Sequence, residues 1–225
     1  FKTIIACGSS NDWMMKNGII PTYAAICDPD PVSTKYYTLT DTETKYLLAS
    51  CCDPIIFEHF RGKQIVMWHC DSLEQRPELM KADAPYPYYA IGGGCTVGLR
   101  MISAAIMLGY TNIHMFGFDS CMSEEEHHAY QFATKEEEVG RVYQIKVGDQ
   151  NKFADDAKVF NCSGYQLAQA EHFGQFYRAF HQYFVPTVYG DGLIAATLEH
   201  LYKELAELTE KQREKANGLP PTAEH

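Results

Sequence analysis

Short apolar runs alternate with segments of helical periodicity along the first part of the chain. Lys2–Cys7 is an apolar run that ends in the turn-forming segment Gly8–Asn11, which predicts a buried strand followed by the start of a helix. Gly18 is expected to stop that helix, and Tyr23–Cys27 is predicted to form the next strand. A strand, a helix and a strand within about 30 residues make the repeat unit of a parallel sheet.

The rest of the chain continues this alternation, with one departure. Val142–Val147 alternates between apolar and polar residues and is followed by Gly148–Asn151, which predicts an inserted β-hairpin or flap within about residues 120–161. The other expected elements are helices over Thr40–Ala49, Thr96–Leu108, a long segment capped by Ser163, and about Ala195–Lys211, and strands over Pro54–Phe57, Gln64–Trp68, Ile113–Asp119 and Val185–Tyr189.

These elements predict an α/β fold, a Rossmann-like and mostly parallel sheet with helices on both faces and an inserted β-hairpin. We expect a single domain over residues 1–212 and a flexible tail over 213–225. Because Phe1 stands directly inside a strand-like run and is not Met, we expect residues to precede it. The aromatic segment around residues 84–89 and the terminal helix could form an interface, so the sequence leaves open whether the chain forms a homo-oligomer.

Composition narrows the class of protein. The 225 residues carry a net charge of −10, which argues against broad binding of nucleic acid. We find no secretory signal and no apolar run long enough to span a membrane. The 8 cysteines show no CxxC spacing, so we expect reduced thiols in a cytoplasmic protein.

Two glycine-containing turns are candidate phosphate sites, because glycine lets a backbone approach an anion and a helix start offers N–H donors. The alternatives are an ordinary tight turn for the first and a crowded helix–sheet contact for the second. The predicted cofactor-binding residues are Gly8, Ser9, Ser10 and Asn11 in the first turn, and Gly93, Gly94, Cys95 and Thr96 in the second.

Acidic residues follow two of the expected strands. Asp28 and Asp30 could hold Mg²⁺ bound to a diphosphate, although Asp and Pro are also common in ordinary turns. Asp119 ends a later strand and should face the ligand crevice of an open α/β sheet. Asp28, Asp119 and His128 are the predicted catalytic residues, with His128 assisting proton transfer.

Several of these segments carry a family resemblance. Gly92–Arg100, Leu108–Tyr110 and Ile113–Ser120 resemble the signature of the MptE-like family, named for the archaeal 6-hydroxymethylpterin diphosphokinase. His127–Tyr130 and Tyr189–Leu193 look like a bacterial and phage subgroup of that family. Flagellin-modifying glycosyltransferases are further relatives, and family 42 sialyltransferases are distantly similar.

The resemblance implies a Rossmann-like fold with a nucleotide crevice. The named enzyme transfers a diphosphate from ATP, with Mg²⁺, to a hydroxymethyl group. This chain has Asp-Pro-Asp-Pro at residues 28–31 where the pterin enzymes carry an Asp-Leu-Asp-Gly type sequence, so the small-molecule or glycan acceptor is left open.

The leading hypothesis is a transferase using a nucleotide-activated donor, through Mg²⁺-dependent diphosphate transfer from ATP to a hydroxyl-bearing acceptor. The alternatives are a sialyltransferase-like glycosyltransferase that uses a nucleotide sugar, and a non-catalytic nucleotide- or sugar-binding module.

Overall fold

The computed structural model describes residues 2–70, 90–122, 141–148 and 158–217. The chain falls into two compact units, Phe1–Thr111 and Asn112–His225, and each has its own secondary structure. The single domain expected over 1–212 stays a prediction. Among the described residues, no helix has both the length and the apolar character that crossing a bilayer requires.

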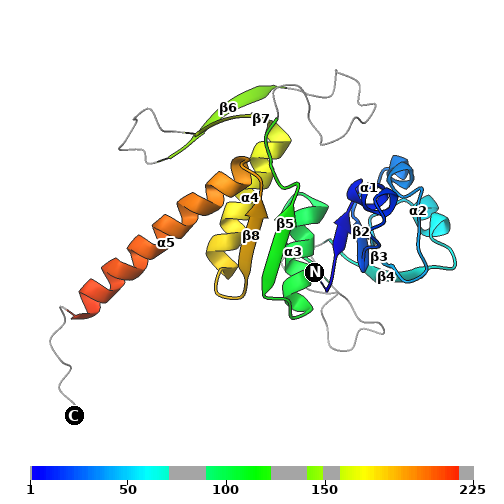
Figure 1. Ribbon diagram of the computed structural model, residues 1–225, viewed down its shortest axis with the longest axis horizontal. Coiled ribbons are helices and arrows are strands. Elements are labelled where there is room, and N and C mark those ends of the chain that lie inside the picture. Colours follow the sequence, from blue (N-terminus) through cyan, green and yellow to red (C-terminus); the bar gives the residue numbers. More distant parts are fainter. Residues whose placement is uncertain (1, 71–89, 123–140, 149–157, 218–225) are drawn as a thin grey trace, which may run out of the picture. The chain divides into compact units, whose positions relative to one another are not determined.

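The first unit is built on a parallel sheet of four strands (Figure 1). Its strands are β1 (Ile5–Cys7), β2 (Tyr23–Ile26), β3 (Lys45–Ala49) and β4 (Gln64–Trp68), and they lie side by side in chain order. The helices of this unit are α1 (Ser10–Lys16), the 3₁₀ helix η1 (Pro31–Tyr36), α2 (Pro54–His59) and α3 (Val97–Met107). Because the strands are parallel, their carboxyl ends share one edge of the sheet.

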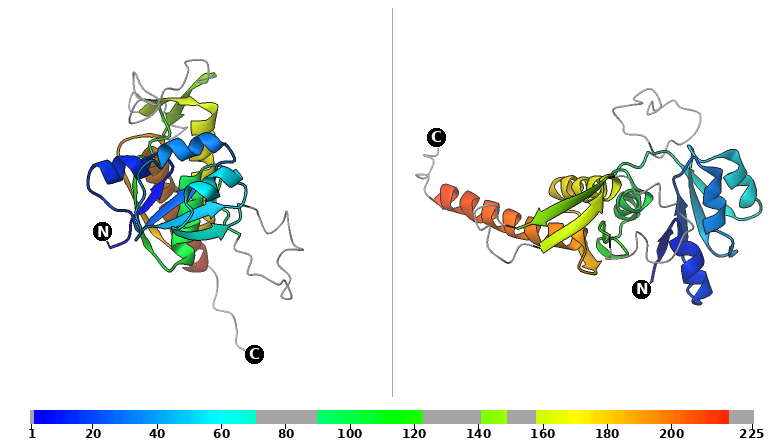
Figure 2. Two further views of the ribbon diagram at one scale, coloured as in Figure 1. Left: turned by 90° about the vertical axis from the view of Figure 1, so that its right-hand side faces the viewer. Right: turned by 90° about the horizontal axis from the view of Figure 1, so that it is seen from above.

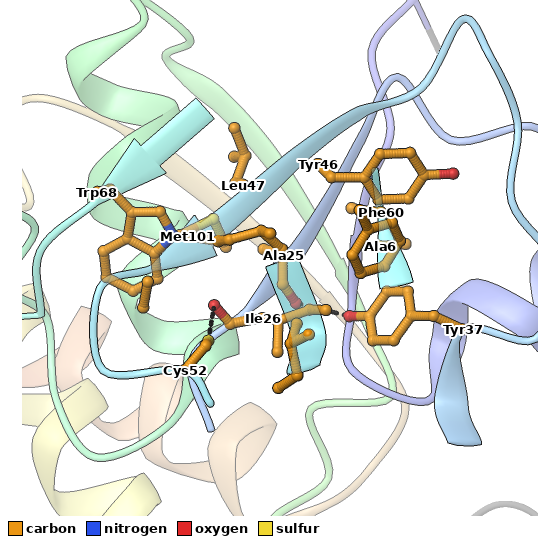
Figure 3. Close-up of a cluster of buried hydrophobic side chains, with 14 of the residues drawn as sticks. Ala6, Ala25, Ile26, Tyr37, Tyr46, Leu47, Cys52, Phe60, Trp68 and Met101 are labelled. Carbon is orange, nitrogen blue, oxygen red and sulfur yellow. Dashed lines mark hydrogen bonds between the residues drawn. The ribbon is translucent and has the colours of Figure 1, made fainter. Parts of the chain in front are cut away.

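The core of the first unit lies on both faces of this sheet. Tyr46–Ala49 are four consecutive buried residues of β3, and successive side chains of a strand point to opposite faces. On one face the Tyr46 ring lies 4.3 Å from that of Phe60. Nearby, the Tyr37 hydroxyl donates to the Ala25 carbonyl over 2.7 Å (Figure 3).

Two of the expected elements in this unit are wrong. Residues 40–44 are not helical and Lys45–Ala49 form strand β3, because a short apolar run buried on both faces has no periodicity to separate it from a helix. Pro54–Phe57 belong to helix α2 instead of a strand. Asp53 caps that helix by accepting from the Ile55 N–H over 2.8 Å, and Pro54 occupies the first helical position, where proline is favoured.

The second unit contains two small sheets and two long helices. Strands β5 (Asn112–Phe116) and β8 (Val185–Tyr189) are parallel, and β6 (Val142–Val147) and β7 (Lys158–Ser163) form the antiparallel hairpin expected from the sequence. Helices α4 (Gly164–Phe180) and α5 (Leu193–Asn217) lie side by side (Figures 1 and 2). The α/β class is therefore confirmed, with a parallel sheet, helices and an inserted hairpin.

Candidate functional site

The turn after β1 is closed largely by its own groups. Gly8 adopts the left-handed conformation (φ +54°), and its N–H donates to the Ala25 carbonyl over 3.2 Å. The Ser10 hydroxyl accepts from the Cys7 N–H at 2.9 Å and donates to the Cys7 carbonyl at 3.0 Å. Ser9 occupies the N-cap position of α1 without a side-chain capping bond. The glycine is therefore needed by the turn itself, and phosphate binding there stays a prediction.

Asn11 and its neighbour Asp12 tie α1 to the segment after η1. The Asn11 side chain is buried, and its Nδ2 donates to the Leu39 carbonyl at 3.0 Å. Asp12 accepts from the N–H groups of Thr38 and Leu39 at 3.0 and 3.1 Å, and from the Thr38 hydroxyl. The amide that we expected to face a ligand thus supports the fold, and its Oδ1 atom is buried without a hydrogen-bond partner among the described residues.

The glycine-rich segment before α3 contains one position, Gly93, that packs too close to the helix for any side chain. Gly93 and Gly94 both have positive φ angles, +121° and +117°. A Cβ atom on Gly93 would lie 2.7 Å from the Ser103 hydroxyl and 2.9 Å from the Leu99 carbonyl of α3, so close approach to the helix requires glycine at this position. Thr96 caps α3 by accepting from the Leu99 N–H over 3.2 Å. This supports the crowded-contact alternative at Gly93 and leaves a ligand role for Gly94, Cys95 and Thr96 as a prediction.

Arg100 of α3 places a positive charge that acts on Cys27, the residue directly after β2. Its Nη1 donates to the Ile91 carbonyl over 2.7 Å. Burial raises the pKa of the Cys27 and Cys95 thiols, and the Arg100 charge acts against that rise in both. Sequence reasoning missed Arg100, although a cation in the first turn of a helix after a glycine-rich segment is a recognisable signal for anion binding.

Asp28 and Asp30 are exposed at the carboxyl end of β2. Asp28 Oδ1 accepts from the Asp30 N–H at 2.9 Å, and Asp30 Oδ1 accepts from the Val32 N–H at 2.8 Å. One oxygen of each carboxylate therefore shapes the turn. Two exposed carboxylates also supply the hard oxygen ligands that Mg²⁺ prefers, so the donor set fits the predicted metal.

In the second unit, Asp119 and Asp191 lie beyond the carboxyl ends of the paired strands β5 and β8. A Cβ atom on Gly190 would lie only 2.7 Å from Asp119 Oδ1, so the turn passes close to this carboxylate. Burial and then the Asp191 charge raise the pKa of Asp119. Sequence reasoning did not select Asp191, although Gly-Asp-Gly directly after a strand could have indicated it.

The residue after Asp119 anchors this loop to its own unit. Ser120 is buried and has a positive φ of 51°, a conformation that costs energy for a residue other than glycine. Its hydroxyl donates to Gln169 Oε1 of α4 at 2.9 Å, and its carbonyl accepts from the Cys162 thiol of β7 at 3.3 Å. His128, predicted to be catalytic, lies outside the described residues.

A protein-family model decides the family. The model described as 6-hydroxymethylpterin diphosphokinase MptE-like matches residues 2–125. The chain belongs to the MptE-like family. The matched residues of this MptE-like chain include the Gly8 turn, Asp28 and Asp30, the Gly93 segment and Asp119, whereas His128 and Asp191 lie beyond them.

The fold of this MptE-like chain also has a solved relative. It is similar to MAf glycosyltransferase from Magnetospirillum magneticum AMB-1, with a TM-score of 0.61 and 17% sequence identity over 84% of this chain. The chain spans 28% of that protein's length, so the similarity concerns the fold alone. No protein of curated function matches the chain at a significant level.

Proposed function

We propose that this MptE-like chain is a transferase that transfers a diphosphate from ATP, with Mg²⁺, to a hydroxyl-bearing acceptor. The observation that carries the proposal is the exposed pair Asp28 and Asp30 at the carboxyl end of β2, inside the residues that match the diphosphokinase family model. The carboxyl ends of parallel strands are where open α/β sheets bind their ligands.

The charges of the first unit suit a nucleotide. Asp28 and Asp30 would hold Mg²⁺, which when bound neutralises charge on the phosphates. Arg100 offers a guanidinium for a phosphate oxygen, the planar donor group best suited to that contact. ATP is highly anionic and the chain carries a net charge of −10, so local cations are needed for ATP to bind.

In the second unit, Asp119 is the residue predicted to accept a proton. A general base works best when its pKa lies near the working pH. Burial and the Asp191 charge raise the pKa of Asp119 above the ordinary aspartate value, which is the direction that such a role requires.

Glycosyl transfer from a nucleotide sugar is the second candidate. It is favoured by the similarity in fold to a glycosyltransferase over 84% of the chain. Both reactions need an activated nucleotide donor and neutralisation of its phosphates, so they differ in the donor and in the need for metal. A non-catalytic binding module is the third candidate, and an experiment must distinguish it from the two transfer reactions.

Thermal-shift measurements would test which nucleotide is the donor. We expect ATP to raise the melting temperature with Mg²⁺ and to have little effect with a chelator; a ligand at about 100 times its Kd adds about 2.7 kcal/mol. A shift with CMP- or UDP-sugars and no metal requirement would instead support glycosyl transfer. Binding without turnover of any offered acceptor would favour the module, and no shift with any nucleotide would contradict both transfer reactions.

Matched variants would locate the metal. Asp28→Asn and Asp30→Asn keep an oxygen acceptor for their turns and remove one charge each, and we expect the Mg²⁺-dependent part of ATP affinity to fall at least about 10-fold. Asp41→Asn is the control, because Asp41 Oδ1 makes the same kind of turn with the Glu43 N–H at 2.7 Å. Unchanged Mg²⁺ dependence in both test variants would rule out these aspartates as ligands.

A further inference from the structure

Three cysteines come together at the carboxyl edge of the four-stranded sheet. Cys27 directly follows β2, Cys51 lies two residues beyond β3, and Cys70 lies two residues beyond β4. These strands are parallel neighbours, with Ile26 opposite Leu48 and Ala49 opposite Trp68. The sheet therefore assembles a thiol cluster from residues that are far apart in the sequence and show no metal-binding spacing.

The sulfur atoms are close enough to share one ion. All three Sγ atoms lie within 4.8 Å of one another, and those of Cys51 and Cys70 are 3.5 Å apart. A tetrahedral zinc ion with Zn–S bonds of about 2.3 Å holds its sulfur ligands about 3.8 Å apart. The Cys51–Cys70 spacing is slightly shorter than that value and no pair is more than 4.8 Å apart, so small side-chain rotations would give a ligating arrangement.

The neighbouring Cys52 does not join this cluster. Its side chain is buried, and its Sγ donates to the Ile26 carbonyl over 3.7 Å (Figure 3). Cys51, by contrast, is exposed, while Cys27 and Cys70 are half-buried. The cluster is thus reached from solvent at Cys51, and the described residues supply no fourth ligand of the same kind.

The electrostatics of the cluster depend on burial, on the thiols themselves and on Arg100. Burial raises the pKa of Cys27, and the Cys51 and Cys70 thiols raise it further. Burial and the Cys70 thiol raise the pKa of Cys51 to about 11. Arg100, whose charge acts on Cys27, would offset the single negative charge left when three thiolates bind a divalent ion.

A disulfide is the competing explanation. The sulfurs of Cys51 and Cys70 are neighbours, and one bond between them would use two of the thiols and leave Cys27 unexplained. A metal ion accounts for the convergence of all three. Soft thiolate ligands select thiophilic ions such as Zn²⁺ over the Mg²⁺ that carboxylates prefer, so the cluster is chemically distinct from Asp28 and Asp30.

We propose that Cys27, Cys51 and Cys70 form a three-thiolate binding site for Zn²⁺, with a fourth ligand that the described residues do not supply. Binding replaces three S–H bonds with three Zn–S bonds and releases three protons to the solvent, with no change of oxidation state. The ion would join the carboxyl ends of β2, β3 and β4 directly beside the Asp28 turn.

Metal titration of the reduced chain would test the site. We expect one Zn²⁺ per chain, and calorimetry in buffers of different ionisation enthalpy should report release of about three protons per ion. Zinc X-ray absorption should show about three sulfur atoms in the first shell at about 2.3 Å. A first shell of nitrogen and oxygen only would overturn the proposal, without any need for a variant.

Serine variants would assign the ligands. Replacing Cys27, Cys51 or Cys70 by Ser should weaken Zn²⁺ binding more than about 100-fold, since losing even an outer-shell partner costs about 10- to 100-fold. Cys52→Ser is the matched control and should bind as the natural chain does. Equal loss in the control would overturn the assignment, as would a reduced chain that binds no Zn²⁺ and loses two hydrogens in intact mass on oxidation.

Discussion

At the scale of single residues, Asp119 makes stability depend on pH. Its pKa is raised by burial and by the Asp191 charge, so the folded state keeps this proton to a higher pH than the unfolded state does. Between the ordinary and the raised pKa the folded chain binds more protons, and the free energy of unfolding therefore falls as pH rises.

Asp119→Asn should remove this penalty. We expect a melting temperature about 1 °C higher than that of the natural chain at neutral pH and no difference in acid, where the carboxyl is protonated; exposed charge interactions are worth less than about 1 kcal/mol. Melting curves across a pH series would measure the difference. A destabilisation of the same size at every pH would show that the carboxylate acts through its hydrogen bonds and not through its charge.

Gly192 is the second residue whose substitution should change the free energy of unfolding. A Cβ atom there would lie 2.6 Å from the Asp119 Cα and would also clash with the Asp119 carbonyl oxygen, and backbone atoms cannot move aside as a flexible side chain can. We expect Gly192→Ala to lower the free energy of unfolding by about 2–3 kcal/mol in urea titrations. Gly92→Ala is the control, because nothing lies within 4 Å of its Cβ position; equal effects would contradict the packing argument.

At the scale of elements, helix α4 depends on its first turn. The Ser163 hydroxyl accepts from the Gln166 N–H at 3.3 Å, and Gln166 Oε1 accepts from the Ser163 N–H at 2.9 Å. Ser163→Ala should cost about 1 kcal/mol of stability by chemical denaturation. Ser163→Asp, which keeps a capping oxygen, should recover most of it, and failure to recover would show that the serine acts through packing.

The elements also show where the local sequence was sufficient to predict secondary structure and where it was not. Ser163 was recognisable as a helix cap because a cap is defined by residues within one turn of it. The helix expected at strand β3 is wrong because the four buried residues Tyr46–Ala49 have no helical or alternating period. Their burial on both faces depends on neighbouring strands, which local sequence does not specify.

At the scale of the whole molecule, the two compact units should be separable by spectroscopy. The chain has 2 tryptophans, Trp13 and Trp68, and both belong to the unit Phe1–Thr111. Tryptophan fluorescence therefore reports that unit alone, whereas far-ultraviolet circular dichroism reports both.

We expect Gly192→Ala, in the second unit, to shift the dichroism transition in urea and to leave the fluorescence transition in place. Coincident probes indicate a single cooperative transition. If both transitions moved together, the two units would unfold as one body, which would favour the single domain expected over residues 1–212.

The sequence by itself determined the local features: the strand–turn–helix alternation at the start of the chain, the Ser163 cap, the hairpin, and the acids and glycines that follow the strands. Each depends on residues within a few positions of one another. Only the tertiary structure decided that Asn11 serves the fold, that Gly93 is needed by its contact with α3, that Asp191 acts on Asp119, and that Cys27, Cys51 and Cys70 share one edge. The last two depend on which strands are neighbours and in what register, and chain proximity carries no information about either.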